Sequence, residues 1–270
     1  MKRQPSVAGQ FYPGTEASLR KEVQRLIGIS KSAAKEKAIG VVSPHAGYMY
    51  SGAVAGCVFS SIEIPETIII LGPNHTGAGA RFSLFKEGIW NTPLGDVEID
   101  NELAEIILKK CRFLKEDTKA HMHEHSLEVQ LPFMQYLKGA DFKIVPMVLS
   151  AYELDAYKDL GNSIASAIKQ LKKEALIVAS SDMTHYEDQK SAERKDKIAI
   201  EAMLNLDEIQ LMHKVEALNI SMCGYIPAAV MLIAAKGLGA KQAELIKYQT
   251  SGDATGDYNA VVGYAGIVVK

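Results

Sequence analysis

Short runs of apolar, mostly β-branched residues recur along the chain and alternate with longer amphipathic segments. The clearest run, Thr-Ile-Ile-Ile-Leu at 67–71, lies between Pro65 and Gly72. Such a run is typical of a strand that is buried on both faces of a parallel sheet. Similar runs predict strands at 38–43, 142–149 and 175–179. Helical periodicity predicts helices at 16–28, 52–62, 152–172, within 190–218 and at 225–238.

The end of the chain has a different pattern. Residues 243–250 and 258–269 predict a terminal pair of strands joined by a turn that contains Gly and Asp. No stretch has the composition of an interdomain linker, and no internal repeat is visible. Because strands and helices alternate along the chain, we predict a single α/β domain over residues 1–270. Its central sheet is expected to be mainly parallel and flanked by helices.

Composition and charge exclude several classes of protein. Lys and Arg total 30 against 32 for Asp and Glu, which gives a net charge of −2 and no basic surplus for nucleic acid. The 3 cysteines form no Cys-x-x-Cys pair, so a disulfide framework is not expected. There is no signal-peptide pattern and no apolar run of the roughly 18 residues that a membrane helix needs. We therefore expect a cytoplasmic protein that binds neither nucleic acid nor membrane.

Three histidines follow predicted strands directly. His45 lies in Ser-Pro-His-Ala-Gly-Tyr after the first strand, and His75 lies in Gly-Pro-Asn-His-Thr-Gly after the second. Asp182 and His185 lie in Ser-Ser-Asp-Met-Thr-His after the strand at 175–179. In open α/β sheets, ligands bind beyond the carboxyl ends of the strands. Since parallel neighbours bring these ends to one edge, we predict a shared site there.

A fourth cluster of histidines lies at 121–128, in His-Met-His-Glu-His-Ser-Leu-Glu. An apolar helical pattern follows it, so Ser126 or a neighbour is expected to cap that helix. His125 would then lie at the helix entrance and face the strand-end pocket. His121 and His123 are expected to be loop residues, and His213 to lie on a helix surface.

Cys223 immediately precedes the apolar helix predicted at 225–238. Helix N-termini favour thiolate, which suits a reactive or metal-binding cysteine. The local pattern also allows a small buried packing residue, the role we expect for Cys57 and Cys111. The chain has no Gly-x-Gly-x-x-Gly after a strand, no P-loop, no His-Glu-x-x-His and no Gly-x-Ser-x-Gly. Nucleotide binding and serine-hydrolase chemistry are therefore poorly supported.

Taken in order, several of these segments resemble the Memo family, whose prokaryotic members are called AmmeMemoRadiSam system protein B. The opening Ala-Gly-Gln-Phe-Tyr-Pro-Gly at 8–14 and the final Tyr-Ala-Gly-Ile-Val at 264–268 also fit, so the resemblance spans nearly the whole chain. The segments that carry it are SPHAGYMYSG at 43–52, LGPNHTG at 71–77, HEHSLEVQLPF at 123–133, SSDMTHY at 180–186 and MCGYIP at 222–227. The family is similar in fold to the LigB subunit of class III extradiol dioxygenases, which hold iron(II) with two histidines and a glutamate.

The resemblance implies a metal site. His45 and His75 match the metal-binding histidines, and Cys223 matches the third ligand position, where the dioxygenases use glutamate. The resemblance implies that Asp182, His185 and His125 are further residues of the site, with acid–base or substrate-contacting roles. A thiolate in place of a carboxylate favours copper(I), zinc or a different iron chemistry. We therefore expect iron or copper, with zinc as a third candidate, and little or no ring-cleaving dioxygenase activity.

Three functions remain open at this point. The first is a metal-dependent redox enzyme. The second is a non-catalytic module that binds a small molecule or a peptide in the same pocket, which suits the link of eukaryotic relatives to signalling and cell motility. The third is a zinc-type hydrolase that uses a metal-bound water with His185 or Asp182 as base. The family name also implies a pathway shared with radical-SAM and AMMECR-type proteins.

Overall fold

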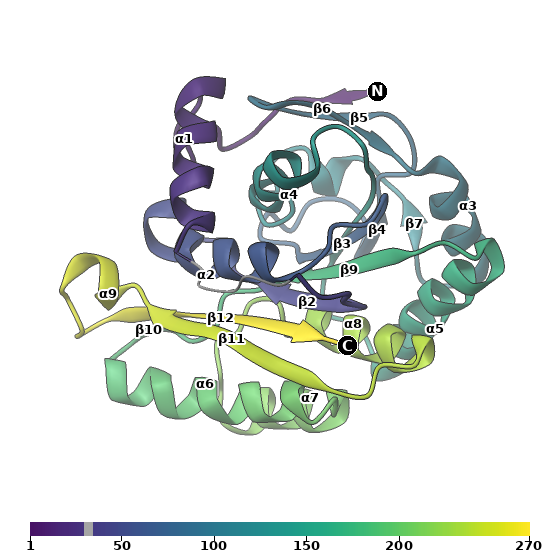
Figure 1. The fold of residues 1–270 in the computed structure, drawn as a ribbon. Helices are drawn as coiled ribbons and strands as arrows, with labels where there is room; N and C mark the ends of the chain where they lie inside the picture. Colours follow the sequence, from purple (N-terminus) through teal and green to yellow (C-terminus); the bar gives the residue numbers. More distant parts are fainter. Residues whose placement is uncertain (30–34) are drawn as a thin grey trace.

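A computed structural model describes residues 1–29 and 35–270. In this part of the chain a 12-stranded sheet is flanked by helices (Figure 1). The strands are β1 (Lys2–Arg3), β2 (Gly40–Ser43), β3 (Thr67–Pro73), β4 (Phe82–Leu84), β5 (Ile89–Thr92), β6 (Gly95–Ile99), β7 (Lys115–Glu116), β8 (Lys143–Leu149), β9 (Ala175–Ser180), β10 (His185–Glu187), β11 (Ala243–Thr250) and β12 (Val261–Val269).

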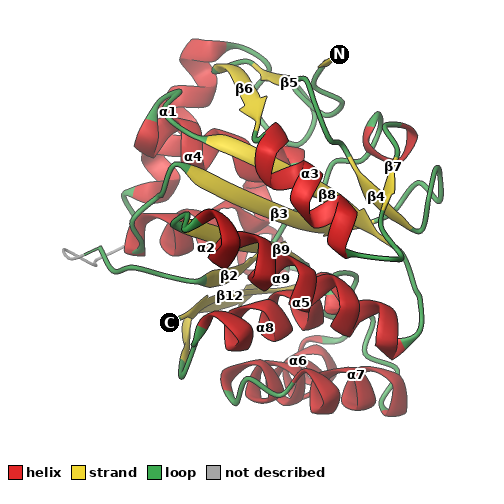
Figure 2. Cartoon of the chain, turned by 90° about the vertical axis from the view of Figure 1, so that its right-hand side faces the viewer, coloured by secondary structure: helices red, strands yellow, loops and turns green. Residues whose placement is uncertain are grey.

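The helices cover both faces of the sheet. They are α1 (Glu16–Ile27), α2 (Tyr48–Ser61), α3 (Asn101–Lys110), α4 (Leu131–Lys138), α5 (Leu154–Leu171), α6 (Gln189–Leu204), α7 (Glu208–Ala217), α8 (Tyr225–Leu238) and α9 (Gly252–Thr255), with short 3-10 helices η1 (Lys119–His121) and η2 (Glu128–Gln130). Figure 2 shows α3, α5 and α8 over one face of the sheet, with α1, α2 and α4 on the other side. No helix within the described ranges has the length and apolar character needed to cross a membrane.

Four parallel strands form the centre of the sheet, in the order β8, β3, β9, β2. Ile69 of β3 pairs with Val145 on one side and Ile177 on the other, and all three side chains are fully buried. Alternate side chains of β3 point to opposite faces, so Ile69 and Leu71 join one apolar cluster while Ile68 and Ile70 join the other. The parallel centre therefore lies between two hydrophobic layers, as predicted.

The predicted elements are found with small shifts. The four central strands and the helices at 16–28, 152–172, within 190–218 and at 225–238 are present. The helix predicted at 52–62 begins earlier, at Tyr48, whose backbone N–H donates to the carbonyl of Phe11. The terminal strand pair is β11 and β12, with α9 in the connecting turn. In residues 82–116 the sequence indicated only a helical pattern around Cys111, and the structure has β4 to β7 and α3, which ends just before it at Lys110.

His121 is not the loop residue that we expected. It ends the 3-10 helix η1, and its side chain is fully buried in edge contact with the rings of Phe85 and Trp90. Among the residues that the structure describes, none forms a hydrogen bond to either ring nitrogen of His121. Burial, assisted by the positive charge of Arg3, lowers the pKa of His121 to about 3. The imidazole is therefore neutral in the folded protein.

Because an unfolded histidine has a pKa of about 6.5, the unfolded chain binds more protons than the folded one below that pH. His121 should therefore reduce stability as pH falls from about 6.5 towards 3, by about 1.4 kcal/mol for each pH unit. We predict that His121→Phe lowers the difference in unfolding free energy between pH 7 and pH 5 by about 2 kcal/mol, as measured by urea denaturation. The exposed His213→Phe serves as control. Equal pH dependence in wild type and His121→Phe would contradict the prediction.

Candidate functional site

Three strand ends converge at one edge of the sheet. Ser43 ends β2, Pro73 ends β3 and Ser180 ends β9, and these strands lie side by side in the order β3, β9, β2. The segments that follow them carry His45, His75 and Asp182, in that order along the chain. Parallel pairing thus places these side chains together, at the edge where open α/β sheets bind ligands.

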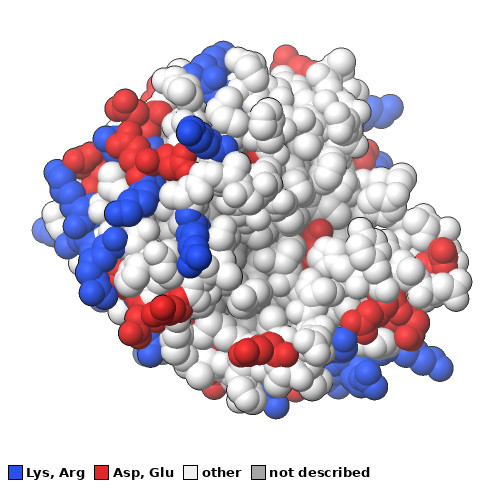
Figure 3. Space-filling view, turned by 180° about the vertical axis from the view of Figure 1, so that it is seen from behind, with Lys and Arg blue, Asp and Glu red and all other residues white. Residues whose placement is uncertain are grey.

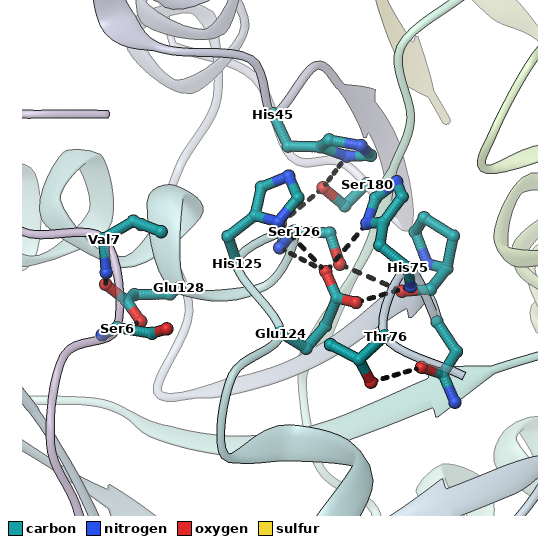
Figure 4. Close-up of polar contacts among 12 residues, drawn as sticks. Ser6, Val7, His45, His75, Thr76, Glu124, His125, Ser126, Glu128 and Ser180 are labelled. Atoms are coloured by element: carbon teal, nitrogen blue, oxygen red, sulfur yellow. Dashed lines mark hydrogen bonds and ion pairs between the residues drawn. The ribbon is translucent and has the colours of Figure 1, made fainter. Parts of the chain in front are cut away.

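Three histidines lie close enough to share a metal ion. One ring nitrogen each from His45, His75 and His125 lie within 4.8 Å of one another. The ring centroids are 5.1 Å apart for His45 and His75, and 4.7 Å apart for His75 and His125. Figure 4 shows the three rings turned towards one another, with His125 coming from the segment between η1 and η2 rather than from a strand end.

Ser180 fixes the orientation of the His45 ring. Its hydroxyl donates to the carbonyl of Ser126 at 2.6 Å, so its lone pairs accept from Nε2 of Gln130 at 2.8 Å and from Nδ1 of His45 at 2.9 Å. We therefore assign the proton of the neutral His45 ring to Nδ1. Burial, together with the charges that the neighbouring histidines would carry, lowers the pKa of His45 well below its usual value. Nε2 consequently has a free lone pair.

Glu124 fixes the orientation of the His75 ring, as Ser180 does for the His45 ring. Its fully buried carboxylate accepts from Nδ1 of His75 at 2.9 Å, from the backbone N–H of His75 at 2.7 Å and from the N–H of Ser126 at 2.9 Å. Burial alone would raise the pKa of Glu124, but these hydrogen bonds and the nearby histidines together lower it to about 2. A carboxylate that orients a histidine in this way is typical of metal sites.

The same hydrogen bonds correct our expectation for Ser126. Its N–H is bound to Glu124, and its hydroxyl donates to the carbonyl of Pro73 at 3.3 Å. It does not cap a helix: η2 follows, and α4 begins only at Leu131, without a side-chain cap. His125 lies beside it, half-buried, with Nδ1 at 3.5 Å from the Glu124 carboxylate. Burial lowers the pKa of His125, so this ring is also largely neutral at neutral pH.

Cys223 reaches the same site from the start of α8. Its sulfur lies 3.2 Å from Nε2 of His45, the nitrogen that Ser180 leaves free. Gly224 permits this approach, since a Cβ there would lie 2.3 Å from the carbonyl oxygen of Ser180. Burial and the nearby Asp182 carboxylate raise the pKa of the free thiol, so proximity to the helix start does not produce a thiolate by itself. The group of three side chains with metal-ligand spacing contains His125, whereas the predicted ligand set contained Cys223 in that place.

Asp182 and His185 lie beside this group. Asp182 accepts a hydrogen bond from the backbone N–H of His45 at 2.7 Å, and burial raises its pKa to about 6 although that hydrogen bond opposes the shift. His185 belongs to β10, which pairs with the start of β12. Its Nδ1 lies 2.8 Å from the carbonyl of Ser221 and therefore carries the proton, which leaves Nε2 free. His185 is not part of the three-histidine group.

The other sequence predictions for cysteine and histidine have clear outcomes. Cys57 and Cys111 are buried and free, as expected for packing residues. His123 and His213 are exposed. Glu124, Gln130 and Ser180 were missed as residues that support the site. The adjacency of Glu124 to His125 in the sequence was the one available signal, because no local pattern shows that Gln130 and Ser180 meet.

Comparison with known proteins agrees with the family resemblance of the sequence and with the fold. The model of the family described as Memo-like protein matches residues 3–268. A MEMO1 family protein of Methanopyrus kandleri is 43% identical over 281 residues, covering 100% of this chain and 99% of that protein. One from Aquifex aeolicus is 47% identical over 267 residues, covering 98% of each.

A solved structure shows a similar fold. The crystal structure of an uncharacterized protein of Escherichia coli K12 superposes with a TM-score of 0.57 and 12% identity, covering 86% of this chain and 100% of that one. At this identity the likeness extends to the fold alone. The match of the family model over nearly the whole chain, together with full-length relatives above 40% identity, shows that the chain belongs to the Memo family.

Proposed function

We propose that the chain binds a transition metal, iron or copper, through Nε2 of His45, Nε2 of His75 and the sulfur of Cys223, and that it acts as a metal-dependent redox enzyme. One observation carries the proposal: each of the two histidines has its Nδ1 proton engaged by a buried acceptor, Ser180 or Glu124. The opposite nitrogens are thereby left free, and the Cys223 sulfur lies next to one of them. A soft sulfur beside two imidazoles fits copper or iron.

The chain's own residues would orient a substrate and move protons around such a metal. When bound, the ion would supply electron-transfer and Lewis-acid chemistry. Asp182, with a pKa of about 6, can hold or release a proton close to neutral pH. His185 presents a free Nε2, and His125 lies half-buried beside the ligands. These are the three residues to which we assign acid–base or substrate-contacting roles.

The three-histidine group favours a second candidate, a zinc-type hydrolase. Three histidines with an open fourth position are a common ligand set of catalytic zinc. In that case His125 would replace Cys223 as the third ligand, and Asp182 or His185 would be the base. A pocket that binds a small molecule or a peptide without turnover is the outcome expected if neither metal chemistry is found.

The proposal extends to the cellular setting. We propose a cytoplasmic protein, in a pathway shared with radical-SAM and AMMECR-type proteins, that does not bind nucleic acid. On the face shown in Figure 3, Lys and Arg lie beside Asp and Glu instead of forming a stripe of one sign, and a hollowed band across the middle carries few charges. Such a surface favours a small or weakly charged ligand over a polyanion.

Substitutions of the candidate ligands distinguish the two proposed ligand sets, which differ in Cys223 and His125. We predict that His45→Ala and Cys223→Ser abolish or strongly weaken binding of copper(I) and iron(II), whereas His125→Ala retains stoichiometric metal. The measurements are metal content and competition affinity, with the exposed His213→Ala as control. Loss of metal in His125→Ala together with full retention in Cys223→Ser would favour the zinc site and contradict the redox proposal.

The Glu124 carboxylate should strengthen metal binding through its hydrogen bond to His75. In Glu124→Gln the side-chain oxygen can still accept from His75, but the negative charge is lost. We predict a roughly 10- to 100-fold weaker metal affinity, the usual effect of removing a carboxylate that orients a ligand. Glu98→Gln, an exposed carboxylate at the amino end of the sheet, should leave the affinity unchanged. An unchanged affinity in Glu124→Gln would show that its hydrogen bonds are only structural.

The sulfur of Cys223 should also suppress the ring-cleavage reaction of extradiol dioxygenases. We predict little or no extradiol cleavage of catechol-type substrates by the iron-loaded protein, because the third ligand position holds Cys223 where the ring-cleaving enzymes hold a carboxylate. Oxygen uptake and product absorbance with catechol measure this directly. Robust ring cleavage would show that the thiolate can replace the carboxylate.

A further inference from the structure

The N-terminal segment, residues 2–12, is held by a fully buried arginine. Arg3 lies in β1, and its guanidinium lies 4.2 Å from the centre of the Trp90 ring. Its Nε donates to the carbonyl of His121 at 2.7 Å, and its Nη2 donates to the carbonyl of Glu124 at 2.7 Å. One planar group therefore fixes two points of the stretch that leads to His125.

The third partner of Arg3 is the Glu128 carboxylate, which is also fully buried. Arg3 Nη1 lies 2.7 Å from one oxygen of Glu128, and that oxygen also accepts from the backbone N–H of Ser6 at 2.8 Å. The other oxygen accepts from the N–H of Val7 at 3.1 Å and the hydroxyl of Tyr12 at 2.6 Å. Glu128 thus joins the N-terminal segment to the stretch 121–128.

The N-terminal segment also touches the site itself. The ring of Phe11 lies 4.7 Å from the ring of His125, and the carbonyl of Phe11 accepts from the N–H of Tyr48. Tyr48 begins α2, directly after the turn that carries His45. Residues 2–12 therefore connect the stretch that holds Glu124 and His125 with the turn that holds His45.

A buried ion pair is an expensive way to hold two segments together. Removing two charges from water costs several kcal/mol for each ion, and apolar side chains of similar size often stabilise a fold as well or better. Apolar contacts, however, do not fix the orientation of the groups that they bring together. One of the three short hydrogen bonds of Arg3 holds the carbonyl of Glu124, and the side chain of Glu124 orients His75.

We propose that Arg3 and Glu128 are positioning residues of the site. They hold the backbone at 121–128 so that the Glu124 carboxylate meets Nδ1 of His75 and the His125 ring faces His45. This inference rests on the proposed function, because the rings are positioned to bind a metal. The orientation of the rings can nevertheless be measured without any metal. A lysine cannot replace Arg3, because one ammonium cannot reproduce a planar fork with three fixed acceptors.

The test measures histidine tautomers in the metal-free protein at one fixed pH, by two-bond 1H–15N NMR of the rings. Wild-type His75 should carry its proton on Nδ1 only. In Arg3→Met, Arg3→Lys and Glu128→Gln, we expect a mixture of the two His75 tautomers and shifted His125 ring signals. The matched control is Asp100→Asn, which weakens the partly buried Asp100–Lys173 pair at the amino edge of the sheet. It should lower the melting temperature and leave both rings unchanged.

Binding of Co²⁺ alone, followed by its visible absorption, is the second measurement. We expect about tenfold weaker binding in the three variants and wild-type binding in Asp100→Asn. Unchanged His75 and His125 signals in the folded Arg3→Lys and Glu128→Gln proteins would overturn the inference, even if Arg3→Met fails to fold. So would ring changes of equal size in Asp100→Asn. Failure of the wild-type protein to bind Co²⁺ would instead count against the proposed function, and the tautomer result would still decide the role of Arg3.

Discussion

The site depends on the parallel pairing of β3, β9 and β2. Their register buries one isoleucine- and valine-rich strand against the next, and it brings the residues after Ser43, Pro73 and Ser180 to one edge. Close packing on both faces of the sheet fixes this arrangement, because a shift of one residue would exchange the side chains of the two layers and break their fit. The positions of His45, His75 and Asp182 follow from the same packing that stabilises the fold.

The need of buried polar groups for hydrogen-bond partners then determines which atoms face the site. Glu124 and Ser180 are fully buried, and each uses its oxygen atoms for a histidine Nδ1 and for nearby backbone or side-chain groups. Because an unpaired buried polar atom costs about 1–3 kcal/mol, these contacts strongly restrict ring rotation. The outcome is a pair of imidazoles whose free Nε2 atoms point into the site, with the Cys223 sulfur beside one of them.

The sequence predicted the parallel centre of the fold because those strands are apolar along their whole length. It also placed His45, His75 and His185 beyond strand ends, which follows from a general rule for α/β sheets. It predicted no strand in 82–116, where β4 to β7 are short and partly polar and so lack a clear period. Periodicity contains no information on long-range pairing, so it did not show that Arg3, Glu128 and His121 meet in one buried cluster.

The central claim is that a transition metal is held by two histidines of fixed tautomer and one sulfur. A crystal structure of the metal-loaded protein, with anomalous scattering collected at the absorption edge of the metal, tests it most directly. We predict a single anomalous peak within bonding distance of Nε2 of His45, Nε2 of His75 and the sulfur of Cys223. A peak bonded to His45, His75 and His125 but distant from Cys223, or no peak among these residues, would contradict the claim.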